Sequence, residues 1–335
     1  MIIKLLIVFI MLFTIFWIVN MALYIRSKNH SNKALEKIIL KFPFNLFLKP
    51  YKQGWTILTF KTSKPLEQFN TINLPHKSTI NLADKDCSGL ADPFLFKEDS
   101  NYYLFFEYEY HKYLKKGADI AYATSKNGID WVYQKKILQE PFHQSYPYVF
   151  KKDENFYMLP ESYQSNQVRL YKAKNFPENW VLDTVLFEGV QFVDTIFVEV
   201  DAIYYWITTN LISNELLLFY SENLKAPWIK HPCSPLTNYV KNNRNAGPII
   251  KYNCKLYRVA QDGTKGYGSG INLYQILEIS KTNYVERAIK EPLFFKKSGI
   301  FKDAVHQLSI LNENGTEKLV ALDGANFAMN KIIIK

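Results

Sequence analysis

Four acidic residues stand at the edges of apolar, aromatic-rich runs, where an ordinary surface charge is not expected. Asp92 opens DPFLF, Glu107 lies in FFEYEY, Glu161 follows YMLP and Asp194 precedes TIFV. Glycosyl chemistry needs such a set, because one carboxyl group moves a proton at the glycosidic oxygen while another stabilises the anomeric carbon or deprotonates an acceptor hydroxyl. The alternative is structural, since acidic side chains also cap turns by accepting backbone N–H groups.

A second group of polar residues lies in HQSYP, residues 143–147. His143 can carry a proton, while Ser145 and Tyr146 offer hydroxyl groups for sugar recognition, and the Tyr146 ring can stack on a sugar face. Ser145 lacks the Gly-x-Ser-x-Gly turn that exposes a nucleophilic serine. The alternative for this segment is a turn packed by its Tyr–Pro pair.

Residues suited to an anionic group follow in NNRNAGP and YRVAQDG, which contribute Arg244, Arg258, Gln261 and Asp262. Arginine recognises phosphate or carboxylate through paired hydrogen bonds, so a sugar donor or a lipid phosphate is a candidate ligand. An ion pair between Arg258 and Asp262 inside the fold is the structural alternative. His306 is a candidate for the same site or a hydrogen-bonded core histidine.

The glycine-rich segment GTKGYGSG, residues 263–270, has no strand-GxGxxG-helix context around it. It is therefore a weak candidate for a phosphate loop. The pattern instead predicts a hairpin turn that carries Tyr267 at the rim of the site.

The elements that position these residues repeat along the chain. Trp131, Trp180 and Trp228 each close a polar turn and fall 49 and 48 residues apart. Strand-like openings recur at ADPFLF (91–96), SYPYVF (145–150), VDTIFV (193–198), AGPIIK (246–251) and AVHQLSI (304–310). A period of this length built from short strands is typical of a β-propeller. Five openings predict an all-β, five-bladed β-propeller, with the repeated tryptophans serving as packing residues.

The propeller fold has a consequence for chemistry, because the first strand of each blade lines the central channel. Aligning Asp92, Tyr146, Asp194, Gly247 and His306 gives steps of 54, 48, 53 and 59 residues. Residues far apart in sequence are therefore expected to meet at one mouth of the channel, where ligands bind. The alternating segment at 54–62 is expected to complete the last blade and close the ring.

Composition and charge narrow the class of partner. The chain has 335 residues, 48% hydrophobic and 16% aromatic, with a net charge of +10. Residues 1–52 hold eight Lys/Arg and one acid, so they alone supply +7. A nucleic-acid binder would spread basic residues over its folded surface, so nucleic acid is not an expected partner. The three cysteines form neither a metal-ligand pattern nor a disulfide framework, and neither a metal nor a cofactor is expected.

An apolar segment from Leu5 to Ile25 is long enough to cross a bilayer as a helix. We expect a single-pass membrane protein, with an anchor at 1–28, a juxtamembrane linker or short helix at 29–52 and the propeller at 53–335. A cleaved signal peptide is the alternative. Lys4 precedes the segment and three basic residues follow it closely, Arg26, Lys28 and Lys33, which favours a propeller on the cytoplasmic side.

The motifs also resemble a known family. The run ADPFLF…YYLFFE…IAYATSKNGIDW…FHQSYPYVF…FYMLPES is similar to the N-terminal domain of plant glucosamine inositolphosphorylceramide transferases, a domain that bacterial proteins carry alone or fused to other modules. The resemblance covers roughly residues 50–335. More distantly, the chain resembles the five-bladed propeller glycosidases of the arabinanase/xylosidase and invertase/levansucrase groups.

The resemblance implies roles for three acids. In the propeller glycosidases an Asp of the first blade, an acid of a middle blade and an Asp that tunes the acid form the catalytic set, and Asp92, Glu161 and Asp194 stand at the matching positions. Glu161 departs from the glycosidase pattern because it ends its strand in a PES context. In the plant enzymes a separate exostosin-like domain is thought to carry the transfer. This propeller is expected either to catalyse by itself or to bind a glycan or lipid for a partner.

We therefore expect a membrane-anchored, glycosyltransferase-like enzyme of cell-surface polysaccharide or glycolipid biosynthesis. Its partners would be a carbohydrate or sugar-lipid substrate, with a nucleotide sugar as a candidate donor. Asp92 would be the base toward the acceptor, Glu161 the acid or stabiliser and Asp194 the residue that tunes it. A glycoside hydrolase of the five-bladed propeller type and a non-catalytic glycan-binding propeller are the alternatives.

Overall fold

In a computed structural model, the described residues are 12–13, 16–17, 48–52, 54–72, 74, 80, 86–110, 117–225, 227–295, 301–313, 316–326 and 329–334. The chain forms two compact units, one of residues Gly54–Asn326 and one of Met1–Gln53 with Phe327–Lys335. In the second unit, β1 (Leu48–Lys52) pairs antiparallel with β22 (Met329–Ile334). This last stretch, expected in the propeller, therefore pairs outside it.

The expected membrane anchor at 1–28 and the juxtamembrane linker or short helix at 29–52 lie mostly outside the described residues. Among the residues that the structure does describe, none belongs to a helix with the length and apolarity that crossing a membrane requires. The single-pass anchor accordingly stays a prediction from the sequence.

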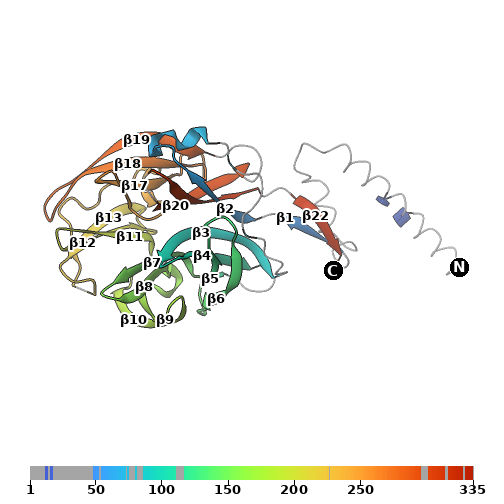
Figure 1. Cartoon of the computed structure of the whole chain (residues 1–335), viewed down its shortest axis with the longest axis horizontal. Coiled ribbons are helices and arrows are strands. Elements are labelled where there is room, and N and C mark those ends of the chain that lie inside the picture. Colours follow the sequence, from blue (N-terminus) through green and yellow to red (C-terminus); the bar gives the residue numbers. More distant parts are fainter. Residues whose placement is uncertain are drawn as a thin grey trace. The chain divides into compact units, whose positions relative to one another are not determined.

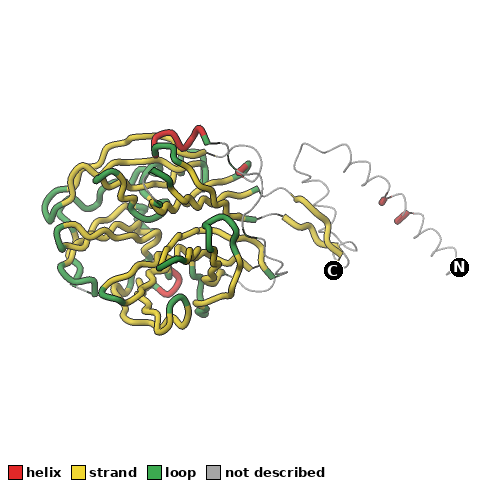
Figure 2. Tube along the Cα trace, in the orientation of Figure 1, coloured by secondary structure: helices red, strands yellow, loops and turns green. Residues whose placement is uncertain are grey.

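The larger unit is the predicted five-bladed propeller (Figure 1). Blade one has strand order β3-β4-β5-β6, blade two β7-β8-β9-β10 and blade three β11-β12-β13-β14. In blade four, the short β15 and β16 both pair with β17, which is followed by β18 and β19. Blade five has the order β20-β21-β2, so the segment predicted to close the ring does so. Strands dominate this unit, and its helical turns are short (Figure 2).

The strands of each blade have the following bounds, given in the order of their labels above. Blade one comprises Cys87–Glu98, Asn101–Tyr110, Ala118–Ser125 and Val132–Leu138. Blade two comprises Ser145–Lys152, Asn155–Glu161, Gln167–Asn175 and Glu178–Glu188, and blade three Phe192–Val200, Ile203–Asn210, Glu215–Ser221 and Ile229–Lys230. Blade four comprises Arg244–Asn245, Ile250–Tyr252, Lys255–Asp262, Gly270–Ile279 and Tyr284–Phe295, and blade five Ala304–Asn312, Lys318–Ala325 and Trp55–Thr62. The 3-10 turns η2 and η3 span Leu66–Thr71 and Tyr163–Ser165.

The repeated tryptophans pack between these elements, as predicted. The Trp131 indole N–H donates to Thr59 Oγ1 at 2.8 Å and so joins blade one to blade five. Trp180 is buried in the apolar cluster that joins blades one to four, and the Trp228 ring lies 4.9 Å from the buried Trp206 ring. Their spacing in the sequence therefore reports blade-to-blade packing and not a ligand platform.

Each blade's first strand is irregular where the channel begins. In four blades the pairing with the second strand shifts register, at Ala91/Phe94, Ser145/Tyr148, Val193/Ile196 and Val305/Leu308. Asp92, Tyr146 and Asp194 have φ angles of 51°, 49° and 51°, and Gly247, between β15 and β16, has 132°. A β-bulge frees one residue from the ladder and redirects its side chain. The residues aligned from the sequence are therefore the bulge positions of the fold.

At each of the five aligned positions the backbone N–H group donates to a side chain instead of to the ladder. Their donor–acceptor distances lie between 2.9 and 3.2 Å. The acceptors are Asp323 for the amides of Asp92 and His306, Asp92 for Tyr146, Glu161 for Asp194 and the Tyr146 hydroxyl for Gly247. These bonds connect all five first strands to side chains of the channel.

Replacing Tyr146 by Phe tests this arrangement. The substitution removes the hydroxyl that accepts the Gly247 amide, and a buried unsatisfied N–H costs about 1–3 kcal/mol. We expect chemical denaturation of Tyr146→Phe to show a loss of that size in the free energy of unfolding. Tyr239→Phe, at an exposed tyrosine, is the matched control and should stay within about 0.5 kcal/mol. Equal stability of the two variants would contradict a structural role for the Tyr146 hydroxyl.

Candidate active site

The candidate site lies at the end of the channel where the first strands begin. The bulges direct Asp92 of β3, Asp194 of β11 and His306 of β20 to the same place, as predicted from their alignment. All three side chains are buried, and the Asp92 and Asp194 charges both act on the pKa of His306. Residues separated by more than 200 positions in the sequence thus form one electrostatic group.

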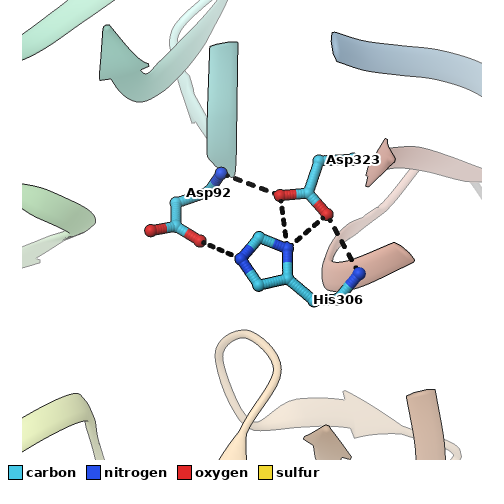
Figure 3. A group of neighbouring side chains, drawn as sticks. All are labelled: Asp92, His306 and Asp323. Carbon is cyan, nitrogen blue, oxygen red and sulfur yellow. Dashed lines mark hydrogen bonds and ion pairs between the residues drawn. The ribbon is translucent and has the colours of Figure 1, made fainter. Parts of the chain in front are cut away.

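The centre of this group is a histidine held between two carboxylates (Figure 3). His306 Nε2 lies 3.4 Å from Asp92 Oδ1, and Nδ1 lies 2.9 Å from the Asp323 carboxylate. Burial would lower the pKa of His306, but the negative charges and hydrogen bond of Asp323, together with Asp92, raise this pKa to about 9. The imidazole is therefore protonated at neutral pH, and it offsets part of the negative charge around it.

Asp323 was not identified from the sequence, although it carries the same signal as the four acids that were. It ends the apolar run VALD of β21, and its side chain is fully buried. Its two oxygens accept the backbone amides of Asp92, His306 and Gln307 in addition to the imidazole contact. Asp323 therefore fixes the positions of both the histidine and the first bulge.

The same three side chains have the composition of a small metal site. One ligand atom from each of Asp92, His306 and Asp323 can be chosen so that all lie within 4.8 Å of one another. However, three backbone N–H groups already donate to the Asp323 oxygens, and a cation would have to compete with them. We interpret the group as an Asp–His–Asp relay, in which His306 is hydrogen-bonded to Asp323 and ion-paired with Asp92.

A second cluster lies beside the relay and contains the other two acids assigned to catalysis. Asp194 Oδ2 accepts from Arg244 Nε at 2.5 Å and from Gln261 Nε2 at 3.3 Å. Glu161, at the end of β8, accepts the Asp194 amide at 3.2 Å. The Arg244 guanidinium is a quarter exposed and lies 5.5 Å from the Tyr267 ring centroid. Arg244 and Tyr267 thus form the solvent-facing side of this cluster.

Glu161 and Asp92 keep their protons up to a pH that is unusually high for carboxyl groups. Burial, with a smaller contribution from the Asp194 and Asp92 charges, raises the pKa of Glu161 to about 8, although Arg244 opposes the shift. Burial raises the pKa of Asp92 to about 7 against the lowering influence of His306. At neutral pH Glu161 is therefore mainly protonated, whereas Asp92 titrates near the working pH of most enzymes.

A third pair extends the site toward blade two. His143 Nε2 lies 3.4 Å from Glu107 Oε1, and burial followed by the Asp92 charge raises the pKa of Glu107 well above its usual value. Ser145 is buried opposite Glu161 in the β7–β8 ladder. Tyr146 is only 1% exposed, and its hydroxyl accepts the Gly247 amide. Its ring therefore cannot stack on a sugar, contrary to the expectation from the sequence.

Two other residues assigned to substrate binding lie elsewhere. Arg258 is fully buried in blade four, where its Nε and Nη2 donate to Glu286 at 2.8 and 2.5 Å. It therefore forms an internal ion pair, but with Glu286 and not with Asp262. Asp262 accepts from the backbone and hydroxyl of Thr264 and so stabilises the turn after β17.

An aromatic cover over His306 completes the site. The Trp55 ring lies 4.2 Å from the imidazole and the Tyr267 ring 5.1 Å from it, measured between centroids. Tyr267 was expected at the rim from its glycine-rich turn, whereas Trp55, in β2, was not assigned to the site. Its place could not be read from the sequence, because Trp55 pairs with Ala325, which is 270 residues away.

Comparison with known sequences gives one family. The sequence model of "Glucosamine inositolphosphorylceramide transferase 1, N-terminal" matches residues 76–314. The chain is 32% identical over 206 residues to glucosamine inositolphosphorylceramide transferase 1 of Oryza sativa subsp. japonica, covering 59% of this chain and 27% of that protein. The Arabidopsis thaliana protein of the same name is 33% identical over 219 residues, covering 63% and 28%. The chain thus spans little more than a quarter of these relatives.

Solved structures are similar in fold. A glycosyl hydrolase from Bacteroides ovatus has a TM-score of 0.55 at 11% identity, covering 73% of this chain and 86% of that one. The catalytic domain of a Coprinopsis cinerea GH62 α-L-arabinofuranosidase also has a TM-score of 0.55, at 12% identity, covering 84% and 100%. At these identities the likeness establishes the propeller architecture alone.

The stability of the protein should fall as the pH rises. Asp92, Glu161 and His306 all have a higher pKa in the folded protein than their usual values of 3.8, 4.5 and 6.5. Each therefore stabilises the fold at low pH, and this contribution is lost as the pH rises through the folded pKa. We expect the free energy of unfolding to drop by at least about 1 kcal/mol between about pH 5 and pH 9. Denaturation at a series of pH values measures it.

The double variant Asp92→Asn/Glu161→Gln is the control for that experiment, because it removes two of the groups with a raised pKa while keeping similar shapes. Its stability should depend less steeply on pH than that of the unmodified protein. A stability that rises over this range, or an unchanged slope in the variant, would contradict the assignment of these pKa shifts.

Replacing Asp323 by Asn should lower the pKa of His306. The substitution removes the negative charge that contributes most to raising it, so the imidazole should become neutral at a lower pH. NMR titration of ¹³C-labelled histidine side chains measures this shift directly. Asp130→Asn, in an exposed turn of blade one, is the matched control. An unchanged pKa of His306 in the Asp323→Asn variant would contradict the relay.

Proposed function

Since the chain belongs to the family defined by the N-terminal domain of glucosamine inositolphosphorylceramide transferase 1, we propose that it is a glycosyltransferase-like enzyme of glycolipid or cell-surface polysaccharide assembly. The substrates would be a sugar donor and a carbohydrate or sugar-lipid acceptor. The relatives that carry this name are transferases by name, and the propeller is the part they share with this chain.

One observation supports an active role for the propeller itself. Two carboxyl groups with different raised pKa values lie in one buried cluster, Glu161 near 8 and Asp92 near 7. A group that is protonated at neutral pH can donate a proton, and a group that titrates near neutral pH is an effective base. Two carboxyl groups whose environments give them different pKa values commonly serve as an acid and a base.

The proposed chemistry assigns one task to each group. The Asp92 carboxylate takes the proton of an acceptor hydroxyl, whose oxygen then bonds to the anomeric carbon of the donor sugar as the bond from that carbon to the leaving oxygen breaks. Glu161 gives its proton to the leaving oxygen or stabilises the charge that develops there. Burial is the main cause of the raised pKa that keeps Glu161 protonated, and the Asp194 charge adds to it.

Arg244 is the proposed contact for an anionic part of the substrate. Its guanidinium is partly exposed and already oriented by Asp194 and the Tyr267 ring. Because arginine binds phosphate in a fixed geometry, a nucleotide-sugar or lipid phosphate is the proposed ligand. Arg258, which was expected to share this task, is engaged by Glu286 inside blade four.

A hydrolase is the second candidate, because the same acid and base could activate water in place of an acceptor. The raised pKa of Glu161 suits a glycosidase acid equally well. The two functions differ in what they need, since a hydrolase releases sugar from an oligosaccharide without an activated donor. A propeller that only binds glycans would be indifferent to the loss of either acid.

The proposed location is a membrane, through the apolar N-terminal segment at Leu5–Ile25, with the propeller on the cytoplasmic side. The support is the sequence, in which this segment has the length of a span and is followed closely by basic residues. Such a location would bring the channel mouth near a lipid-linked acceptor.

A donor screen tests the proposed activity. The full chain, solubilised in detergent, is incubated with radiolabelled nucleotide sugars and a membrane lipid extract, and incorporation of label into lipid is measured. We expect incorporation by the unmodified protein, and a loss of about 10²-fold or more in Asp92→Asn/Glu161→Gln, because acid–base groups contribute factors of this size.

The control is Asp130→Asn/Glu154→Gln, which makes the same chemical changes at exposed positions of blades one and two and should keep full activity. Release of free sugar from oligosaccharides without a donor would assign the hydrolase instead. Activity that survives in the Asp92/Glu161 double variant would contradict both enzymatic proposals.

A further inference from the structure

Arg244 keeps most of its hydrogen-bond donors free for a ligand. Its Nε donates to Asp194 at 2.5 Å, but neither of its terminal nitrogens donates a hydrogen bond within the part of the chain that the structure describes. The acceptor is fixed in turn, because Gln261 Nε2 donates to the same Asp194 oxygen at 3.3 Å. The guanidinium is 26% exposed, and its two free amino groups have the planar geometry that fits a phosphate. Arg244 is therefore an oriented contact for an anion.

The turn that carries Tyr267 is anchored to the first strand of blade five. The Val305 amide donates to the Gly268 carbonyl at 2.8 Å. Gly268 has a φ angle of 73°, and a Cβ atom there would lie only 2.7 Å from the Ala304 Cβ. This glycine therefore allows the turn to approach β20 directly before His306. Because the backbone makes these contacts, the place of Tyr267 does not depend on its own ring.

The Tyr267 ring adjoins both charged parts of the candidate site and is still 59% exposed. Its centroid lies 5.5 Å from the Arg244 guanidinium carbon, 5.1 Å from the His306 ring and 6.0 Å from the Trp55 ring. His306 in turn contacts Asp92. An aromatic side chain that is exposed in a fixed turn leaves a large apolar surface for a ligand. A ligand at this ring is therefore in reach of the free arginine on one side and of the proposed base on the other.

These positions determine which part of a ligand can lie on the ring. A phosphate held by Arg244 brings the group bonded to it within reach of Tyr267. In the proposed reaction the anomeric carbon lies near Asp92, so the group at the ring is the sugar and not a nucleobase. The faces of a hexose carry C–H groups, whereas the face of an aromatic ring carries the negative part of its quadrupole. The two surfaces therefore attract each other, and the sugar hydroxyl groups stay free for hydrogen bonds.

We propose that Tyr267 is a sugar-binding platform, on which the hexose ring of a sugar 1-phosphate lies while Arg244 holds the phosphate. This inference deepens the proposed function, on which it rests for the identity of the site. The platform distinguishes a glycosyl phosphate from other phosphate monoesters, which Arg244 alone does not do. The alternative is a purely structural ring that orients Arg244 through a cation–π contact.

Ligand binding to the full chain in detergent tests the platform without turnover. Dissociation constants are measured by ligand-observed NMR for the 1-phosphates of glucose, galactose, mannose and glucosamine, and for methyl phosphate, which is a phosphate monoester without a sugar ring. We expect the unmodified protein to bind at least one hexose 1-phosphate about fivefold more tightly than methyl phosphate. Tyr267→Leu should remove this preference and leave the affinity for methyl phosphate within about twofold of its original value.

Three further variants make the result specific. Tyr267→Phe keeps the aromatic ring and should keep the preference. Tyr239→Leu is the matched control, because it removes a tyrosine that is 58% exposed, and it should also keep the preference. Arg244→Gln should weaken the binding of both kinds of ligand, since it removes the proposed phosphate contact.

An unchanged preference in Tyr267→Leu would overturn the inference, as would equal affinity of the unmodified protein for methyl phosphate and every hexose 1-phosphate. An equal loss of affinity for both kinds of ligand in Tyr267→Leu would also overturn it, by assigning the ring to the orientation of Arg244. If none of these ligands bound, both the platform and the phosphate contact at Arg244 would be wrong.

The platform and the proposed function can fail separately. A chain that transfers sugar in the donor screen, with a preference that Tyr267→Leu does not change, has the activity without the platform. A chain that is inactive in the screen but keeps a preference dependent on Tyr267 has the platform and only binds sugar phosphates.

Discussion

The structure depends on how five buried backbone amides find acceptors at the start of the central channel. Each first strand bulges there, and a bulge removes its N–H group from the β-ladder. Leaving such a group unsatisfied costs about 1–3 kcal/mol, so every bulge requires a side-chain oxygen from the channel. Asp92, Glu161 and Asp323 supply most of these oxygens. The need to satisfy the backbone therefore brings carboxylates into the one place where five strands converge.

A cluster of buried carboxylates cannot all ionise, and this determines the electrostatics of the site. Burial raises the pKa of Asp92 and Glu161, and each negative charge raises the pKa of the others. His306 and Arg244 are the cations that compensate, one enclosed between Asp92 and Asp323 and the other facing solvent beside Asp194. The acid and base functions proposed for the site follow from this division of charge, because the carboxyl groups that accept the backbone amides differ in pKa.

Much of this arrangement is encoded in local sequence, and the rest depends on distant pairing. The blade period, the five openings and the meeting of Asp92, Asp194 and His306 follow from strand patterns that recur along the chain. Asp323 ends a run like those of the acids that were recognised, so the same rule applied to the last blade would have found it. The position of Trp55 and the Arg258–Glu286 pair follow from which strands are neighbours in space, which no local pattern specifies. Tyr146 shows a further limit, because its motif suggested sugar recognition while its hydroxyl serves a backbone amide.

The five aligned positions each donate a backbone N–H group to a side chain but carry different side chains themselves. At Gly247 a Cβ atom would lie 1.9 Å from the Leu308 carbonyl oxygen, so blade four can contribute only backbone there. Tyr146 reaches from blade two to that glycine with a hydroxyl that stays neutral, because burial raises its pKa well above the usual value. The charged residues at the aligned positions therefore come from blades one, three and five, and Glu161 of blade two lies beside them. Arg244 lies between the acidic cluster and the exposed Tyr267 of the loop after β17, so the acids are nearest to solvent on the side of blade four.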